Sequence, residues 1–307
     1  MSARPNRELL QDIAIELGVH PSFVEKDWYA IQAVSAIVAA DHGGLRPVFS
    51  GGTSLSKGYG IIQRFSEDID FKLLVPGDGL PRAKRSLFRR QLIETLRSSG
   101  SWTIEEDAIE VFDDRRAFRC LLGYDPLFPA TAALRTEVQL EMRLEAPALL
   151  PEERSLTTFV AEACGAGPEV PAIACVTPAE TAADKLSALT WRVLARQRGA
   201  QGDDPTVIRH LHDLAALEAS AVAHPSFPKL ASRLLLQDAT RGNARTKHVS
   251  LPPDERVAAA LKVLNDDPEY RDEYRRFVLD MSYADTSEGL DFDSALAATG
   301  RLRTLLR

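Results

Sequence analysis

Cysteine, long apolar runs and excess positive charge are all scarce in this chain of 307 residues. Its three cysteines show neither a metal-ligand spacing nor an even disulfide set, which predicts small buried side chains in a reducing compartment. The longest apolar run near the start, Ala30 to Ala40, is interrupted by polar residues and is too short to cross a bilayer. The first residues, MSARPNRELL, contain no apolar segment, so we expect no secretory signal, no membrane association and a cytoplasmic location.

The net charge of −7 argues against indiscriminate binding to nucleic acid. Basic residues nevertheless gather in three stretches, at 82–97, 192–198 and 241–248. Each stretch could contact a phosphate backbone or form an ordinary solvated helix face. The sequence contains no internal repeat, no low-complexity tract and no long heptad pattern, and we expect a monomer.

Hydrophobic periodicity and turn signals divide the chain into two parts. The first part is expected to contain helices within 5–41, 53–59 and 83–98, and strands at 47–50, 66–75, 102–110, 117–124 and 134–144. The stretch 162–178 is rich in glycine, proline and alanine, which predicts a connecting loop. Helices are then expected at 178–198, 205–219, 226–238, 253–264, 267–280 and 291–306. We predict an α+β protein, with a mixed sheet flanked by helices in residues 1–146 and an all-helical domain in residues 147–307.

The segment 49–71, FSGGTSLSKGYGIIQRFSEDIDF, joins a glycine turn to an alternating strand. Gly51 and Gly52 would let backbone N–H groups approach a phosphate, and the helix that starts at Thr53-Ser54 would add its positive dipole end. The segment is not a Walker A loop, since no Gly-Lys-Ser/Thr follows at the required spacing. The alternative is a tight turn that simply needs glycine. Lys57 could reach a phosphate or pair with Glu67.

Two aspartates, Asp68 and Asp70, would project from the same face of the strand because strand side chains alternate. Neighbouring carboxylates repel, and a hard divalent cation relieves that repulsion. A third acid from the next strong strand, Glu137 or Glu141, would complete a two-metal site. The alternative for each acid is a solvated strand face.

The helical half offers fewer polar candidates. Lys185 stands alone in an otherwise apolar helix, where it could serve chemistry or extend to the surface. Arg209, His212 and Asp213 share one helix face, and Arg209 and Asp213 could form an ordinary i, i+4 pair. His210 and His212 are two residues apart on a helix and cannot converge on a zinc ion.

Four motifs in this order, GGTSLSK, SEDIDF, DKLSALTWR and RHLHDLAAL, resemble the AbiEii/AbiGii (MenT-type) nucleotidyltransferase toxins. The segments LRTEVQLEMRLEAPALLPEERSLTTFVAE and FVLDMSYADTSEGLDFDSAL are also similar to that family. The resemblance runs from about residue 45 to the end of the chain. It implies a DNA-polymerase-β-like nucleotidyltransferase domain followed by a helical domain.

The resemblance also implies roles for individual residues. The nucleotide phosphates would be held by Gly51, Gly52, Thr53 and Ser54, with Lys57 at the edge of that cradle. Mg²⁺ or Mn²⁺ would be bound by Asp68, Asp70 and Glu141, with Glu137 as the other candidate for the third acid. In the helical part, Lys185 would contact the triphosphate, and Asp213, with Arg209 nearby, would position or activate the acceptor. Many relatives have a basic residue directly before this Asp where the present chain has His212, which leaves the local pairing of Asp213 open.

The implied reaction is transfer of a nucleoside monophosphate from an NTP to an acceptor hydroxyl, with release of pyrophosphate. The expected acceptor is the 3′ end of tRNA, so that translation stops, and the expected partner is an antitoxin of a toxin–antitoxin or phage-defence system. Two alternatives stay open: modification of a protein hydroxyl, and a catalytically dead nucleotide-binding regulator. A glycosyltransferase is disfavoured because only 67 residues precede Asp68, too few for a large nucleotide-binding domain. No residue indicates which NTP is used.

Overall fold

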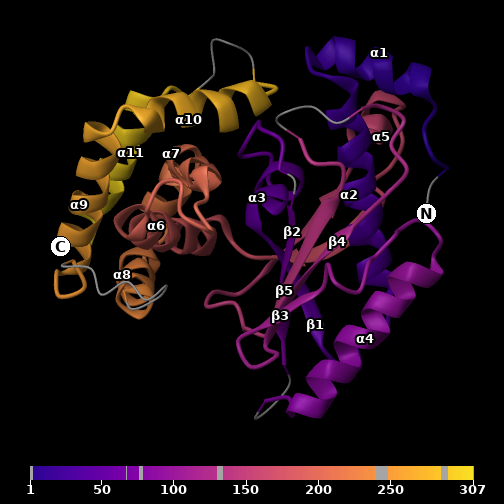
Figure 1. The fold of residues 1–307 in the computed structure, drawn as a ribbon, viewed down its shortest axis with the longest axis horizontal. Coiled ribbons are helices and arrows are strands. Elements are labelled where there is room, and N and C mark those ends of the chain that lie inside the picture. Colours follow the sequence, from indigo (N-terminus) through magenta and orange to yellow (C-terminus); the bar gives the residue numbers. More distant parts are fainter. Residues whose placement is uncertain are drawn as a thin grey trace. The chain divides into compact units, whose positions relative to one another are not determined.

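The computed structural model describes residues 3–66, 68–75, 79–129, 134–239, 248–284 and 290–306, and the chain forms two compact units (Figure 1). The first unit comprises Met1–Gly60 and Phe65–Val176, and the second comprises Ile61–Arg64 and Thr177–Arg307. Glu67, the suggested partner of Lys57, lies outside the described residues, as does most of the basic stretch 241–248.

The first unit is built on one seven-stranded mixed sheet with the order β3-β4-β5-β2-β1-β7-β6. Its strands are β1 (Arg46–Ser50), β2 (Asp68–Leu74), β3 (Glu110–Phe112), β4 (Ala117–Leu122), β5 (Val138–Arg143), β6 (Glu152–Leu156) and β7 (Val170–Cys175). Strand β2 pairs antiparallel with β1 and parallel with β5, and β1 pairs parallel with β7.

Helices cover this sheet and join its strands: α1 (Arg7–Leu17), α2 (Pro21–Ala39), α3 (Gly51–Thr53), a π-helix, η1 (Ser54–Gly58), α4 (Arg82–Ser98) and α5 (Phe159–Ala163). Helix α2 has a proline at its first turn, and the side chain of His20 caps it by accepting from the Ser22 N–H. Because α1, α4, α5 and the sheet all pack against α2, it is buried over most of its circumference.

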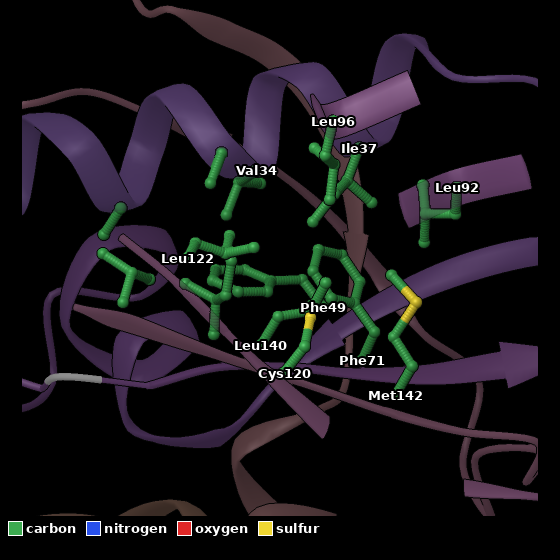
Figure 2. Packing of buried hydrophobic residues seen from close by; sticks show 14 of the residues in the cluster. Val34, Ile37, Phe49, Phe71, Leu92, Leu96, Cys120, Leu122, Leu140 and Met142 are labelled. Atoms are coloured by element: carbon green, nitrogen blue, oxygen red, sulfur yellow. The ribbon is translucent and has the colours of Figure 1, made fainter. Parts of the chain in front are cut away.

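The hydrophobic core lies between one face of the sheet and helices α2 and α4 (Figure 2). Strand β2 contributes Ile69, Phe71 and Leu73 to this core, and β5 contributes Val138, Leu140 and Met142. Since side chains alternate along a strand, the acidic residues between these apolar ones lie on the opposite face of the sheet. The pattern that builds the core therefore also sets the position of the carboxylates.

The boundary between the two parts comes later than residue 146, where the sequence placed it. Strands β6 and β7 follow that point and belong to the same sheet, and the first unit ends at Val176. Strand β7 falls inside the stretch 162–178 that was expected to be a loop from its composition. Its antiparallel pairing with β6 on one side, and its parallel pairing with the distant β1 on the other, decide its conformation.

Two local expectations also differ from the structure. The segment 102–110 is not a continuous strand: only Thr103 forms an isolated bridge, with Gly123, and β3 begins at Glu110. The segment 53–59 is a short α-turn followed by the π-helix rather than a regular helix.

The second unit is helical throughout its described part. It contains α6 (Pro178–Ala195), η2 (Pro205–Ile208), α7 (Arg209–Ala223), α8 (Phe227–Asp238), α9 (Pro253–Asp266), α10 (Glu269–Phe277), η4 (Leu279–Met281) and α11 (Phe292–Thr304). These elements confirm the expected helices, with two differences. The segment 267–280 divides into α10 and η4, and the segment 205–219 begins with the 3₁₀-helix η2 before α7. Helix α6 packs against α7, α8 and α9, and its start is capped as expected, with the Thr177 hydroxyl accepting from the Glu180 N–H.

A short segment of the first half of the chain, Ile61–Arg64, belongs to the second unit. The Tyr283 N–H donates to the Gln63 carbonyl at 3.0 Å, and Arg64 forms an isolated antiparallel bridge with Ser282. The chain thus leaves the sheet after the glycine turn and returns to it just before β2. None of the helices in the described ranges has the length and hydropathy to cross a membrane.

From the position of Phe49 in this core we predict the effect of its replacement on stability. Its side chain is fully buried between β1 and the helices, so Phe49→Ala should leave a cavity and lower the free energy of unfolding of the first unit by about 3–5 kcal/mol. Urea unfolding followed by the fluorescence of Trp28 and Trp102 measures this change. The control is Leu150→Ala, since Leu150 is 88% exposed and should cost less than about 0.5 kcal/mol. Equal losses in the two variants would contradict this placement of the core.

Candidate functional site

The glycine turn lies directly against a carboxylate of β2. Gly51 follows β1 with a φ of 76°, a left-handed backbone conformation that residues other than glycine rarely adopt. A Cβ added at Gly51 would meet Asp70 Oδ2 at 2.0 Å. Glycine is therefore required here twice, once for the backbone angle and once for the space that the Asp70 carboxylate occupies.

The two hydroxyl groups of the turn are turned inward. Thr53 Oγ1 donates to the main-chain carbonyl of Asp68 at 2.5 Å, which fixes the turn to the start of β2. Ser54 is buried beside the Cys175 thiol. In this structure the Thr53 hydroxyl fixes the turn to β2, and the Ser54 hydroxyl is shielded from solvent.

Lys57 lies in the π-helix that follows the turn. Its Nζ is 3.1 Å from Asp27 Oδ1 of α2 and 3.6 Å from the ring centroid of Phe159, and only 5% of its side chain is exposed. The Asp27 carboxylate also accepts from the Phe159 N–H at 2.9 Å. Burial raises the pKa of the Asp27 carboxyl above its ordinary value, although Lys57 beside it acts in the opposite direction. Helices α2 and α5 therefore hold Lys57 in place beneath the turn, in a helix type that is frequent at functional sites.

The register of the sheet places acidic residues side by side. Asp70 of β2 lies opposite Glu141 of β5, and Asp68 lies opposite Gln139. Glu137 precedes β5, so Glu141 is the acid that the register places next to Asp70. On its other side Asp70 lies opposite Ser50, the last residue of β1 before the glycine turn. The turn and the acidic pair thus meet at one place on the exposed face of the sheet.

Two arginines neutralise the outer acids of this group. Arg135 Nη2 lies 3.0 Å from Asp68 Oδ1, and Arg143 Nε lies 2.7 Å from Glu141 Oε1. Their side chains are 46% and 38% exposed, so both can move into solvent. Neither residue was predicted from the sequence. For Arg143 the available signal was its i+2 spacing from Glu141, which puts both side chains on the same face of β5.

The donor set of this face suits a divalent cation. Its members, Asp68, Asp70 and Glu141, offer only carboxylate oxygens, the ligands that Mg²⁺ and Mn²⁺ prefer. Within the part of the chain that the structure describes, no three such side chains are already gathered in a metal-binding group. The chemistry of the acids fits such a cation, which would compete with Arg135 and Arg143 for the carboxylates of Asp68 and Glu141.

A second polar cluster lies inside the helical unit, around Asp213. This side chain is fully buried and accepts from Arg64 Nε at 2.8 Å and from Arg64 Nη2 at 2.6 Å. Lys185 Nζ lies 2.7 Å from Asp213 Oδ2, and His212 Nδ1 lies 3.1 Å from Oδ1. Lys185 and Asp213, selected separately from the sequence, therefore contact each other. Arg64 was missed, because nothing in its local sequence indicates a partner so far along the chain.

Electrostatics keeps the Asp213 carboxyl ionised. Burial alone would raise its pKa, but Arg64 and Lys185 outweigh burial and hold the pKa well below the ordinary value. Burial, together with the charge of Lys185, lowers the pKa of His210 well below its ordinary value, so this imidazole is neutral. Arg209, expected beside Asp213, directs Nη2 to within 3.6 Å of Met281 Sδ.

Taken together, a mixed sheet with a glycine turn against paired acids, in a chain that ends in a helical unit, is the arrangement expected of a nucleotidyltransferase. The sequence model of the family described as "Nucleotidyl transferase AbiEii toxin, Type IV TA system" matches residues 34–298. The chain belongs to this family. No curated protein and no solved structure gives a significant match. The resemblance drawn from the four motifs is thus confirmed, and so is the fold class: this is a toxin-type nucleotidyltransferase of a toxin–antitoxin system.

The contact between Gly51 and Asp70 can be tested by a matched pair of variants. Gly51→Ala and Gly60→Ala both place a side chain on a left-handed backbone, with φ of 76° and 64°. Only at Gly51 does the new Cβ meet another group, since nothing lies within 4 Å of it at Gly60. We expect Gly51→Ala to lower the free energy of unfolding by about 1–3 kcal/mol more than Gly60→Ala. Equal losses in chemical denaturation would show that Asp70 does not occupy this space.

The buried cluster around Asp213 should make the stability of the protein depend on pH in a defined way. Asp213→Asn leaves Arg64 and Lys185 without their buried counter-charge and should cost about 3–5 kcal/mol at pH 7. The pKa of Asp213 is below its ordinary value of 3.8 in the folded protein, so its stabilisation is complete above that pH and is lost as the pH falls through the lowered value.

The difference between wild type and Asp213→Asn should therefore be constant near neutral pH and shrink below pH ~4. The control is Asp272→Asn, which removes a 76%-exposed partner of Arg275 and should change stability by less than about 0.5 kcal/mol. Denaturant titrations at several pH values measure both. If the Asp213→Asn variant is as stable as the Asp272→Asn variant at pH 7, the buried ion pairs are ruled out.

Proposed function

We propose that this protein transfers a nucleoside monophosphate from an NTP to the hydroxyl at the 3′ end of tRNA in the cytoplasm, and thereby blocks translation. The observation that carries the proposal is the pairing of Asp70 with Glu141 on adjacent parallel strands, directly beside the Gly51 turn, in a chain of a nucleotidyl transferase toxin family. The turn supplies a backbone that a triphosphate can approach closely, and the acids supply oxygen ligands next to it.

The proposed metal ligands are Asp68, Asp70 and Glu141. A bound Mg²⁺ or Mn²⁺ would neutralise charge on the triphosphate and on the departing pyrophosphate. Before the substrate binds, residues of the chain itself neutralise the negative charge of this face. Arg135 and Arg143 neutralise Asp68 and Glu141, and their exposed guanidinium groups are then available to phosphate oxygens when the acids take a cation.

For the phosphate cradle we propose the backbone of Gly51, Gly52, Thr53 and Ser54. The inward orientation of the Thr53 and Ser54 side chains supports a backbone role over a hydroxyl role. Lys57 supports the cradle from beneath, where its contact with Asp27 of α2 holds it in place.

Lys185 is proposed to supply a positive charge to the triphosphate. We propose that Asp213 acts by orienting Lys185 and Arg64, with Arg209 on the same helix, and not as the base that activates the acceptor. A general base works best with a pKa near the working pH, whereas the pKa of Asp213 is held far lower by its two cations. Arg64 also stands only four residues before Asp68, which joins the two sets of residues by a short piece of chain.

The family assignment implies an antitoxin partner and a nucleotide substrate. We propose a monomer that acts in toxin–antitoxin control or phage defence.

A labelling experiment tests this function. Purified protein, α-labelled NTPs, Mg²⁺ and total tRNA should give label at the 3′ end of RNA, EDTA should abolish the transfer, and added Mg²⁺ or Mn²⁺ should restore it. Asp70→Asn and Lys185→Ala should each lower the rate by about 100-fold or more, because each removes charge from the transition state. The control is Asp12→Asn on the exposed side of α1, which should transfer at the wild-type rate.

Other outcomes decide between the alternatives. Label on a protein band and none on RNA would show a protein acceptor and overturn the tRNA proposal. Growth arrest by wild type and equally by Asp70→Asn would indicate a binding-only regulator.

A further inference from the structure

One surface of the first unit carries a concentration of positive charge that the proposed reaction does not use. Helix α4 contains six lysine and arginine residues and a single acid, Glu94, in a chain whose net charge is −7. The turn between β3 and β4 adds two more cations, Arg115 and Arg116, and contacts α4. We call the two elements together the α4–turn surface.

Some of these cations have structural partners. Arg82 and Arg85 lie within 3.5 Å of the Asp114 carboxylate, and Arg97 lies 3.0 Å from Glu106. Among the described residues no carboxylate pairs with the remaining five cations. These five are Lys84, Arg89, Arg90, Arg115 and Arg116.

The turn has an unusual backbone. Three consecutive residues that are not glycine, Asp113, Asp114 and Arg115, have positive φ angles of 50°, 47° and 62°. Such conformations cost free energy and persist only where surrounding contacts impose them. Here Arg85 Nη1 donates to the Asp114 carbonyl at 3.0 Å, and the Arg116 N–H donates to the Asp113 carbonyl at 2.8 Å.

The result of this constrained turn is that a further cation lies on α4. Arg115 Nη1 donates to Ser86 Oγ at 2.8 Å, which brings its guanidinium to the helix that carries Arg89 and Arg90. Burial, and then the charges of Arg115 and Arg90, lower the pKa of Arg89 from its ordinary value, and Glu106 acts in the opposite direction. Like charges held this close repel one another. A fold that holds like charges together at a cost in stability gains from an anionic partner that relieves the repulsion.

We propose that Lys84, Arg89, Arg90, Arg115 and Arg116 form a docking surface for the phosphate backbone of the acceptor RNA. The inference rests on the proposed transfer to tRNA. Charge complementarity selects the occupant, since guanidinium groups bind phosphate oxygens in a bidentate manner and a phosphate backbone offers an extended row of them. The 17 residues of α4 span about 25 Å at 1.5 Å per residue, enough to follow several consecutive phosphates.

Binding of fluorescently labelled tRNA without NTP or divalent cation tests this surface directly. The test variant is Arg89→Ala/Arg90→Ala, and its matched control is Arg275→Ala/Arg276→Ala, which removes two adjacent exposed arginines from α10 in the second unit. A further variant, Arg115→Gly, removes a cation while glycine accepts the φ of 62° without strain.

We expect Arg89→Ala/Arg90→Ala to raise the Kd for tRNA by about tenfold at moderate salt, and to reduce the slope of log K against log salt by about 1 for each arginine lost. Arg115→Gly should give a smaller loss of the same kind. Arg89→Lys/Arg90→Lys should bind within about threefold of wild type, because a phosphate contact depends mainly on charge. The control variant should bind as wild type does, and thermal melts should show that each variant is folded.

Two results would overturn the inference: wild-type protein that shows no salt-dependent binding of tRNA, or an Arg89→Ala/Arg90→Ala variant that binds no more weakly than the α10 control. Failure of the proposed function is a separate result. If tRNA binds through these arginines but no nucleotide is transferred to it, the docking surface stands and the proposed transfer to tRNA fails.

Discussion

Repulsion between neighbouring carboxylates is the constraint around which the sheet of this protein is arranged. Parallel pairing of β2 with β5 puts Asp70 directly beside Glu141, with Asp68 on the same face, and the backbone of Gly51 closes over Asp70. Positive charge beside such a face relieves the repulsion between its carboxylates. Arg135 and Arg143 supply that charge in the structure, and a divalent cation can supply it in the proposed reaction. The same alternation that sends these acids outward buries Ile69, Phe71 and Leu140 in the core, so the core and the acidic face share one pattern.

The helical unit contains the inverse arrangement. There one carboxylate, Asp213, holds Arg64 and Lys185 in a buried setting. Removal of the carboxylate leaves two buried positive charges without a partner, and removal of the cations leaves the buried negative charge without one. The two clusters differ in accessibility as well as in sign. The arginines of the sheet are partly exposed and can be exchanged for other cations, whereas Asp213 is sealed from solvent and keeps its partners in one geometry. The acidic face of the sheet is therefore suited to binding and releasing cations, and the cluster around Asp213 is suited to holding its charges in fixed positions.

The sequence was informative wherever a local pattern decides the structure. Alternation located β2 and β5, caps and periodicity located the helices of the second unit, and four motifs identified the family. Long-range pairing was beyond such patterns. Strand β7 was taken for a loop because its glycine-, proline- and alanine-rich sequence does not reveal its pairing with β6 and β1. The choice between Glu137 and Glu141 depended on the pairing register of β2 and β5, which neither strand specifies alone. The inward orientation of Thr53 and Ser54 and the role of Arg64 likewise depend on neighbours that local sequence does not specify.

The four-residue segment Ile61–Arg64 has a consequence for how the protein is made. Arg64 and Asp213 are separated by 149 positions, so during synthesis the arginine emerges from the ribosome long before its carboxylate exists. Closing so large a loop is entropically costly and slow, and the helical unit reaches its final charge balance only after this closure. A nascent toxin would accordingly stay incomplete until most of its chain has been translated. Such a delay limits the time in which an unfinished molecule could act as a toxin.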